Sequence, residues 1–126
     1  MTREATAPAA RSVDWIEICR VDDLYIDRGS AALIGGRQVA VFRLGSGEVY
    51  GLCQKDPYSG AFVMSRGIVG SRGDAPTVAS PMHKQVFDLR TGICLDAMGR
   101  EPQNLNAWST MVVDGIVLVA RQGAAA

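Results

Sequence analysis

The sequence predicts an all-β fold, and three observations indicate it. Turn-forming residues recur at intervals of about 8 to 12 residues, a spacing typical of a β-sandwich or barrel. The pair Asp114-Gly115 separates two β-rich runs, residues 109–113 and 116–120, which is a strong short-range signal for a hairpin. No segment sustains a long helical period, and a single turn of helix is expected only near residues 61–65.

The first half of the chain contains three predicted strands. Residues 13–19 alternate apolar and polar side chains, the pattern of a half-buried strand. Residues 37–44 follow a Gly-Gly pair, and residues 45–48 then turn the chain into a strand at residues 49–53. We expect a hairpin here, because glycine tolerates the positive φ of a tight turn. Residues 56–60, Asp-Pro-Tyr-Ser-Gly, predict another turn.

The second half begins with a glycine-rich stretch. Residues 65–76 read as a loop, with a short strand possible at Ile68-Val69. Residues 77–80 and 85–89 predict a hairpin, and an Arg-Thr-Gly turn leads into a strand at residues 93–95.

The length and the net charge of the chain limit the classes of function it can have. The 126 residues correspond to one domain, which we place at residues 13–121, between flexible tails at residues 1–12 and 122–126. Thirteen basic and 13 acidic residues give a net charge of zero, which argues against general binding to nucleic acid or to an anionic membrane. No apolar run approaches the roughly 20 residues of a membrane span, and no secretory signal is present, so we expect a cytoplasmic protein.

The side chains suited to metal or nucleophilic chemistry are few. Cys19, Cys53 and Cys94 include no Cys-x-x-Cys pair, and buried free thiols are the interpretation we favour for all three. His83 is the only histidine. A mixed zinc site of Cys53, Cys94, His83 and a carboxylate, or a nucleophilic pair of Cys53 and His83, is possible on paper, but neither has a supporting motif.

Two glycine-containing motifs are interpreted as turns. Arg72-Gly73-Asp74 matches a cell-adhesion tripeptide, but a polar turn is the interpretation we favour. The other glycines do not form a phosphate-binding loop, because no Gly-Lys-Ser/Thr follows them and no strand-to-helix unit surrounds them.

Three segments together resemble a Rieske-type iron–sulfur domain. They are VFRLGSGEVYGLCQK, SPMHKQVFDLRTGICL and DGIVLVA, in this order and at similar intervals. The resemblance covers residues 13–121 and implies stacked antiparallel sheets with two loops at one end. In the family each loop brings one cysteine and one histidine to a [2Fe–2S] cluster, so that one iron has two Cys and the other two His ligands.

Each ligand loop of this sequence departs from that pattern at one position. Cys53 falls on a cysteine position, but Lys55 stands where histidine belongs; His83 falls on a histidine position, but Ser80 replaces cysteine. Lysine is a cation without an acceptor, and a serine hydroxyl is a poor match for iron–sulfur chemistry. We therefore expect no cluster, no metal and no other cofactor in this chain.

The stretch KDPYSGAFVMSRGIVGSRGDAPTVASPMHKQVFDLRTGICL is similar to a narrower group, the small subunit of assimilatory NAD(P)H-dependent nitrite reductase. Members of that group also lack cluster ligands. The resemblance implies a large partner subunit that carries FAD, an iron–sulfur cluster and siroheme and reduces nitrite to ammonium. The catalytic centres would then lie on that large subunit, and this chain would be an accessory subunit.

Two alternatives remain open at this level. A working Rieske-type [2Fe–2S] ferredoxin for electron transfer to an oxygenase would need the full ligand set, and an unrelated β-sandwich interaction module would place the two loops far apart. If the small-subunit hypothesis holds, Tyr58, Met82 and Lys84 are candidates to face the partner. Phe62 is a further candidate, although we favour a core position for it, and Lys55 would add positive charge beside Lys84.

Overall fold

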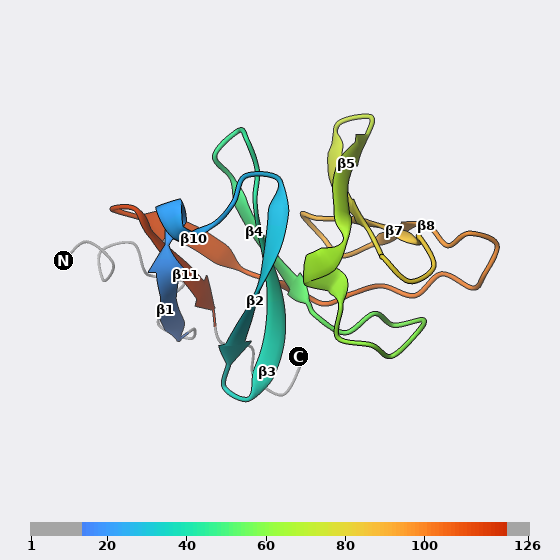
Figure 1. The fold of residues 1–126 in the computed structure, drawn as a ribbon, viewed down its shortest axis with the longest axis horizontal. Coiled ribbons are helices and arrows are strands. Elements are labelled where there is room, and N and C mark those ends of the chain that lie inside the picture. Colours follow the sequence, from blue (N-terminus) through green and yellow to red (C-terminus); the bar gives the residue numbers. More distant parts are fainter. Residues whose placement is uncertain (1–13, 121–126) are drawn as a thin grey trace.

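The computed structural model describes residues 14–120, and the fold is all-β, as predicted. The two predicted tails, and the limits Val13 and Arg121 of the predicted domain, lie outside the described residues. Three antiparallel sheets lie side by side along the longest axis of the molecule (Figure 1). No helix within residues 14–120 is long and apolar enough to cross a membrane.

The first sheet joins the two ends of the described chain in the strand order β1–β11–β10. Its members are β1 (Trp15–Arg20), β10 (Thr110–Val113) and β11 (Ile116–Ala120). The Asp114-Gly115 turn connects β10 to β11, so this predicted hairpin is confirmed. Strand β1 pairs with β11 through a register shift between Glu17 and Cys19.

The second sheet has the order β2–β3–β4–β9 and lies in the middle of the molecule. Its members are β2 (Arg28–Ile34), β3 (Arg37–Arg43), β4 (Val49–Cys53) and β9 (Ala107–Trp108). Strand β3 is buried on both faces. Val39 and Val41 pack in the core shared with the first sheet, while Ala40 and Phe42 pack in the core shared with the third.

The third sheet has the order β5–β6–β7–β8, a meander of short strands. Its members are β5 (Ile68–Arg72), β6 (Ala75–Ala79), β7 (Val86–Asp88) and β8 (Cys94–Asp96). Val78 on β6 and Phe87 on β7 are fully buried against the second sheet. The predicted hairpin on either side of residues 81–84 is confirmed, because β6 and β7 pair directly.

Two predictions needed correction in this part of the chain. Residues 65–76 are not mainly a loop, because β5 runs to Arg72 and pairs with β6 across a tight turn at Gly73-Asp74. The Arg-Gly-Asp tripeptide thus lies at a hairpin turn. The expected turn of helix is a 3-10 turn, η3 (Met64–Arg66), which begins within the predicted range and ends beyond it. A second 3-10 turn, η2 (Val21–Asp23), follows β1.

Candidate functional site

The two loops in the ligand positions of the Rieske pattern lie against each other in the structure. Residues 54–63 follow β4, and residues 80–85 connect β6 to β7 (Figure 1). The Ser80 hydroxyl donates a hydrogen bond of 2.5 Å to Oδ2 of Asp56, and both residues are fully buried. This direct link between the loops contradicts the alternative of an unrelated sandwich in which they lie far apart.

Asp56 also organises the first loop. Its Oδ1 accepts the backbone N–H of Tyr58 at 2.8 Å, and its carbonyl accepts the N–H of Gly60 at 2.8 Å. Its own N–H donates to the carbonyl of Ala61 at 2.8 Å. The Asp-Pro turn is confirmed, and its Asp bonds the local backbone. Sequence reasoning missed the burial of Asp56 and its bond to Ser80, and the signal was the Asp-Pro pair that directly follows a ligand position.

The second loop is closed around Ser80. The Ser80 N–H donates to the Gln85 carbonyl at 2.9 Å, and the Lys84 N–H donates to the Ser80 carbonyl at 3.0 Å. The Ser80 hydroxyl oxygen also accepts the Met82 N–H at 3.1 Å. Lys84 adopts a φ of 67°, which is unfavourable for any residue that has a Cβ. The tight loop leaves Met82, His83 and Lys84 exposed.

The four ligand positions do not fit a [2Fe–2S] cluster. Cys53 is half-buried, while Lys55 and His83 are exposed. Ser80 is the decisive position, because its hydroxyl is already engaged by the Asp56 carboxylate and the Met82 N–H. A hydroxyl in that arrangement does not replace a thiolate ligand.

The zinc alternative also fails in the described part of the chain. Residues 14–120 contain no group of three or more His, Cys, Asp or Glu side chains that could hold a metal ion. The mixed site of Cys53, Cys94, His83 and a carboxylate, which had no supporting motif in the sequence, is therefore not assembled in this part of the chain.

Tyr58, a predicted partner-facing residue, is half-buried and bound within the domain. Its hydroxyl donates to the Glu101 carbonyl at 2.8 Å and accepts the Gln103 N–H at 2.8 Å. Its ring lies 6.4 Å from that of Phe87, and the Arg100 guanidinium lies over it at 5.8 Å. These contacts join the first loop to the segment that leads into β9, so Tyr58 has a structural role.

Several side chains are more exposed than the sequence suggested. Phe62 has 52% of its surface exposed, which corrects the favoured core position and leaves it available to a partner. Cys19, Cys53 and Cys94 are free thiols, as predicted, but all three are half-buried rather than buried. Burial, and secondarily the charge of Asp23, raises the pKa of the Cys19 thiol.

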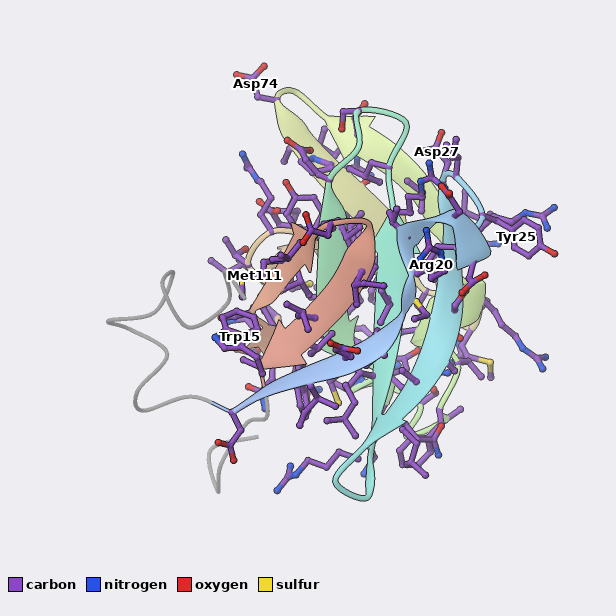
Figure 2. The ribbon with its side chains drawn as sticks, turned by 90° about the vertical axis from the view of Figure 1, so that its left-hand side faces the viewer. Trp15, Arg20, Tyr25, Asp27, Asp74 and Met111 are labelled. Atoms are coloured by element: carbon purple, nitrogen blue, oxygen red, sulfur yellow. The ribbon has the colours of Figure 1, made fainter. Side chains whose placement is uncertain are left out.

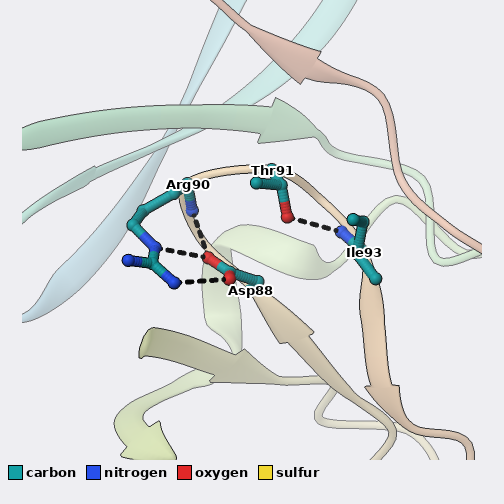
Figure 3. A network of polar contacts seen from close by, with 4 residues as sticks. All are labelled: Asp88, Arg90, Thr91 and Ile93. Carbon is teal, nitrogen blue, oxygen red and sulfur yellow. Dashed lines mark hydrogen bonds and ion pairs between the residues drawn. The ribbon is translucent and has the colours of Figure 1, made fainter. Parts of the chain in front are cut away.

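The segment before β9 is held in place by the β7–β8 turn. Within this turn the Arg90 guanidinium binds the Asp88 carboxylate at 3.0 and 3.2 Å (Figure 3). These hydrogen bonds lower the pKa of Asp88, although burial acts in the opposite direction. Gly92 has a φ of 79° and accepts the Leu105 N–H at 2.8 Å. A Cβ at Gly92 would lie 2.1 Å from the Leu105 carbonyl oxygen, so glycine is required there.

The fold and the paired loops define the class of the protein. Three antiparallel sheets carry two loops that meet through a direct hydrogen bond, and these loops hold the four ligand positions of the Rieske pattern. The family model of the Rieske-like [2Fe-2S] domain matches residues 14–120, and the chain therefore belongs to that family.

Within this family, the chain is similar to subunits of nitrite reductases. The nitrite reductase (NADH) small subunit of Salmonella typhimurium is 38% identical over 82% of this chain and 94% of its own length. The Escherichia coli small subunit is 36% identical over the same shares. A nitrite reductase [NAD(P)H] large subunit from Klebsiella oxytoca is 42% identical over 91% of this chain, but the match spans only 12% of that longer protein.

Solved structures agree with this placement. A crystal structure assigned as an NADH-dependent nitrite reductase small subunit from Mycobacterium tuberculosis has a TM-score of 0.81 and 42% identity, covering 88% of this chain and 97% of the other. The ferredoxin of carbazole 1,9a-dioxygenase from Nocardioides aromaticivorans has a TM-score of 0.73 at 23% identity, covering 86% of this chain and 98% of the other. At that identity the likeness shows the fold alone.

Proposed function

We propose that this chain is the non-catalytic small subunit of an assimilatory NAD(P)H-dependent nitrite reductase in the cytoplasm. Its role is to bind and support a large subunit that carries FAD, an iron–sulfur cluster and siroheme and reduces nitrite to ammonium. The observation that carries the proposal is the match to nitrite reductase small subunits over 94% of their length. The Klebsiella oxytoca relative supports the pairing, because a similar stretch forms 12% of a protein named as a large subunit.

We propose further that the domain holds no cluster and takes no electrons itself. The donor set supports this, because Lys55 and Ser80 stand at two of the four ligand positions and the Ser80 hydroxyl binds Asp56. The same observation disfavours the ferredoxin alternative. Metal analysis and visible absorbance of the purified protein test it, with iron well below one atom per chain as the expected result. Stoichiometric iron with a Rieske-type spectrum would contradict it.

The exposed end of the two loops is the proposed contact with the large subunit. Met82 and Phe62 expose 48% and 52% of their surfaces, and Lys84 is exposed beside Met82. Methionine and aromatic side chains are enriched in protein interfaces. Tyr58 contributes by holding the first loop against Gln103, rather than by offering its hydroxyl to the partner.

Co-purification with the large subunit tests the proposal directly. Wild-type protein is expected to be retained on the immobilised large subunit, and Met82→Ala with Lys84→Ala is expected to raise the Kd at least about tenfold. Val112→Ala with Arg66→Ala makes a matched control, because both residues are exposed elsewhere in the domain. If wild-type protein does not associate, the accessory role is wrong. If wild-type protein associates and the Met82→Ala, Lys84→Ala variant keeps full affinity, the contact lies on another surface.

A further inference from the structure

Two adjoining hollows form a groove beside the first loop. The first, of about 270 Å³, lies between the β2–β3 turn, the end of β4 and β9. The second, of about 290 Å³, continues past Pro57 toward residues 103–106. Cys53, Lys55 and Asn106 line both hollows, so the two are continuous along these residues. We call this surface the Lys55 groove.

The Lys55 groove is lined by cations, amides and apolar groups, without a carboxylate. Arg37 and Lys55 provide the positive charge, and Phe62 and Trp108 provide aromatic surface. Four side-chain amides also line it, namely Gln38, Gln103, Asn104 and Asn106. The ion pairs formed within residues 14–120 involve Arg43, Arg72 and Arg90, and neither Arg37 nor Lys55 takes part in them.

Three carboxylates line a different surface. A separate hollow of about 440 Å³ is lined by Asp27, Glu48 and Asp74, from the loop before β2 and the β3–β4 and β5–β6 turns. Figure 2 shows Asp27 and Asp74 at one end of the molecule, with the β2–β3 turn at the other. The hollow lined by carboxylates and the Lys55 groove, whose lining has none, therefore lie on different surfaces of the molecule. Separate surfaces of this kind orient an approaching charged partner.

The shape and lining of the groove suit an extended peptide better than a small molecule. Each hollow is at or below the small end of the ~300–1,000 Å³ typical of ligand pockets, and the two continue into one another. Asn and Gln side chains carry both a donor and an acceptor, as a peptide backbone requires. The Asn104 oxygen already accepts the Cys94 N–H at 2.8 Å, so Asn104 offers its donor only. Two cations without internal carboxylate partners favour acidic side chains in the occupant.

We propose that the Lys55 groove binds an extended acidic segment of the large subunit, with partner carboxylates at Arg37 and Lys55 and partner backbone against the groove amides. This inference rests on the proposed function, because it names the chemistry of the contact with that subunit. It extends the loop-end contact, to which Phe62 belongs, along a charged groove that Phe62 also lines.

Cross-linking with a water-soluble carbodiimide tests the groove with little ambiguity. The reagent joins an amine to a carboxylate in direct contact through a new amide bond, with the lost water taken up by the carbodiimide. The chain contains two lysines, Lys55 and Lys84, besides its terminal amine. Mass spectrometry of the cross-linked complex is expected to find Lys55 joined to an Asp or Glu of the large subunit. Links through Lys84 alone, or from Lys55 to a second copy of this chain, would overturn the proposal.

Charge reversal gives an independent measurement. Arg37→Glu with Lys55→Glu is expected to raise the Kd for the intact large subunit at least about tenfold, and to make the affinity less sensitive to salt. Arg66→Glu is the single-site control, because Arg66 is exposed and lies outside the groove lining, and we expect it to change the Kd less than about threefold. Thermal unfolding of each variant confirms that it is folded.

The outcomes separate this inference from the proposed function. If wild-type protein does not bind the large subunit, the accessory role itself fails. If wild-type protein binds and the Arg37/Lys55 variant binds equally well, the accessory role stands and the groove proposal is wrong.

Discussion

Replacing Ser80 by alanine should destabilise the domain far more than a surface substitution does. The change removes the hydroxyl that donates to Oδ2 of Asp56 at 2.5 Å and accepts the Met82 N–H at 3.1 Å. Asp56 is fully buried, so water cannot replace the lost donor without a rearrangement of both loops. The loss therefore combines a hydrogen bond with the cost of a buried acceptor left without its partner.

The magnitude follows from the chemistry of this bond. A hydrogen bond to a charged group contributes about 1.5–3 kcal/mol, and an abandoned buried partner places the cost in the upper half of that range. We expect Ser80→Ala to lower the free energy of unfolding by about 2–3 kcal/mol. For a domain of this size, one kcal/mol corresponds to roughly 4 °C in Tm, so Tm should fall by about 8–12 °C.

Equilibrium urea unfolding and thermal melts measure the effect. Ser59→Ala is the matched control, because Ser59 lies in the first loop but is exposed, and its hydroxyl accepts a single N–H at 3.2 Å. The control should cost less than about 0.5 kcal/mol. In the Asp56→Ala background Ser80→Ala should cost at least about 1 kcal/mol less than in wild type. An effect of Ser80→Ala as small as the control would refute the view that this bond holds the loops together.

Three further substitutions test the loops and the turn that supports them. Lys84→Gly should raise the free energy of unfolding by about 1 kcal/mol in urea titrations, because glycine adopts the φ of 67° without strain. The same substitution should weaken binding to the large subunit. A lower free energy of unfolding would contradict the expected relief of strain. Arg90→Gln should lower Tm at pH 7. Because Arg90 holds the folded-state pKa of Asp88 below its ordinary value, that stabilisation is present above about pH 4 and is lost as the pH falls through the folded-state pKa. A Tm difference that does not shrink as the pH is lowered below about 4 would argue against it. Gly92→Ala should cost more than about 2 kcal/mol in urea unfolding, because its Cβ would meet the Leu105 carbonyl, and a neutral result would show that the β7–β8 turn yields easily.

The predicted strands were those whose own side chains carry β propensity. Strands β3, β4 and β11 were predicted to within one residue, because Val, Ile and Phe mark them locally. Strand β2 was missed, because its Gly-Ser-Ala-Ala stretch has weak intrinsic propensity. Its glycine is required by packing, since a Cβ at Gly29 would lie 2.4 Å from the Ser65 carbonyl oxygen in η3. The partner that explains Gly29 is thus distant in sequence.

Contacts between residues distant in sequence also limited what could be predicted of the site. The resemblance to Rieske domains identified both loops and the two substituted ligand positions from the sequence alone. It gave no sign that Asp56 is buried against Ser80, 24 residues away, or that the Tyr58 hydroxyl binds backbone groups 43 and 45 residues further on. Those contacts depend on how three sheets bring separate loops together, and no local pattern encodes them.

The Ser80–Asp56 bond also explains how the loops keep their arrangement with an incomplete ligand set. In a Rieske domain the cluster joins the two loops, because each loop supplies one ligand to each iron. Here a buried hydrogen bond joins the same two loops, and it leaves the side chains at their outer ends free of any ligand role. Met82, His83 and Lys84 are exposed as a result, and Lys55 is exposed at the rim of a groove without carboxylates. This arrangement supports the proposed accessory role, in which the domain binds a redox partner rather than carrying electrons.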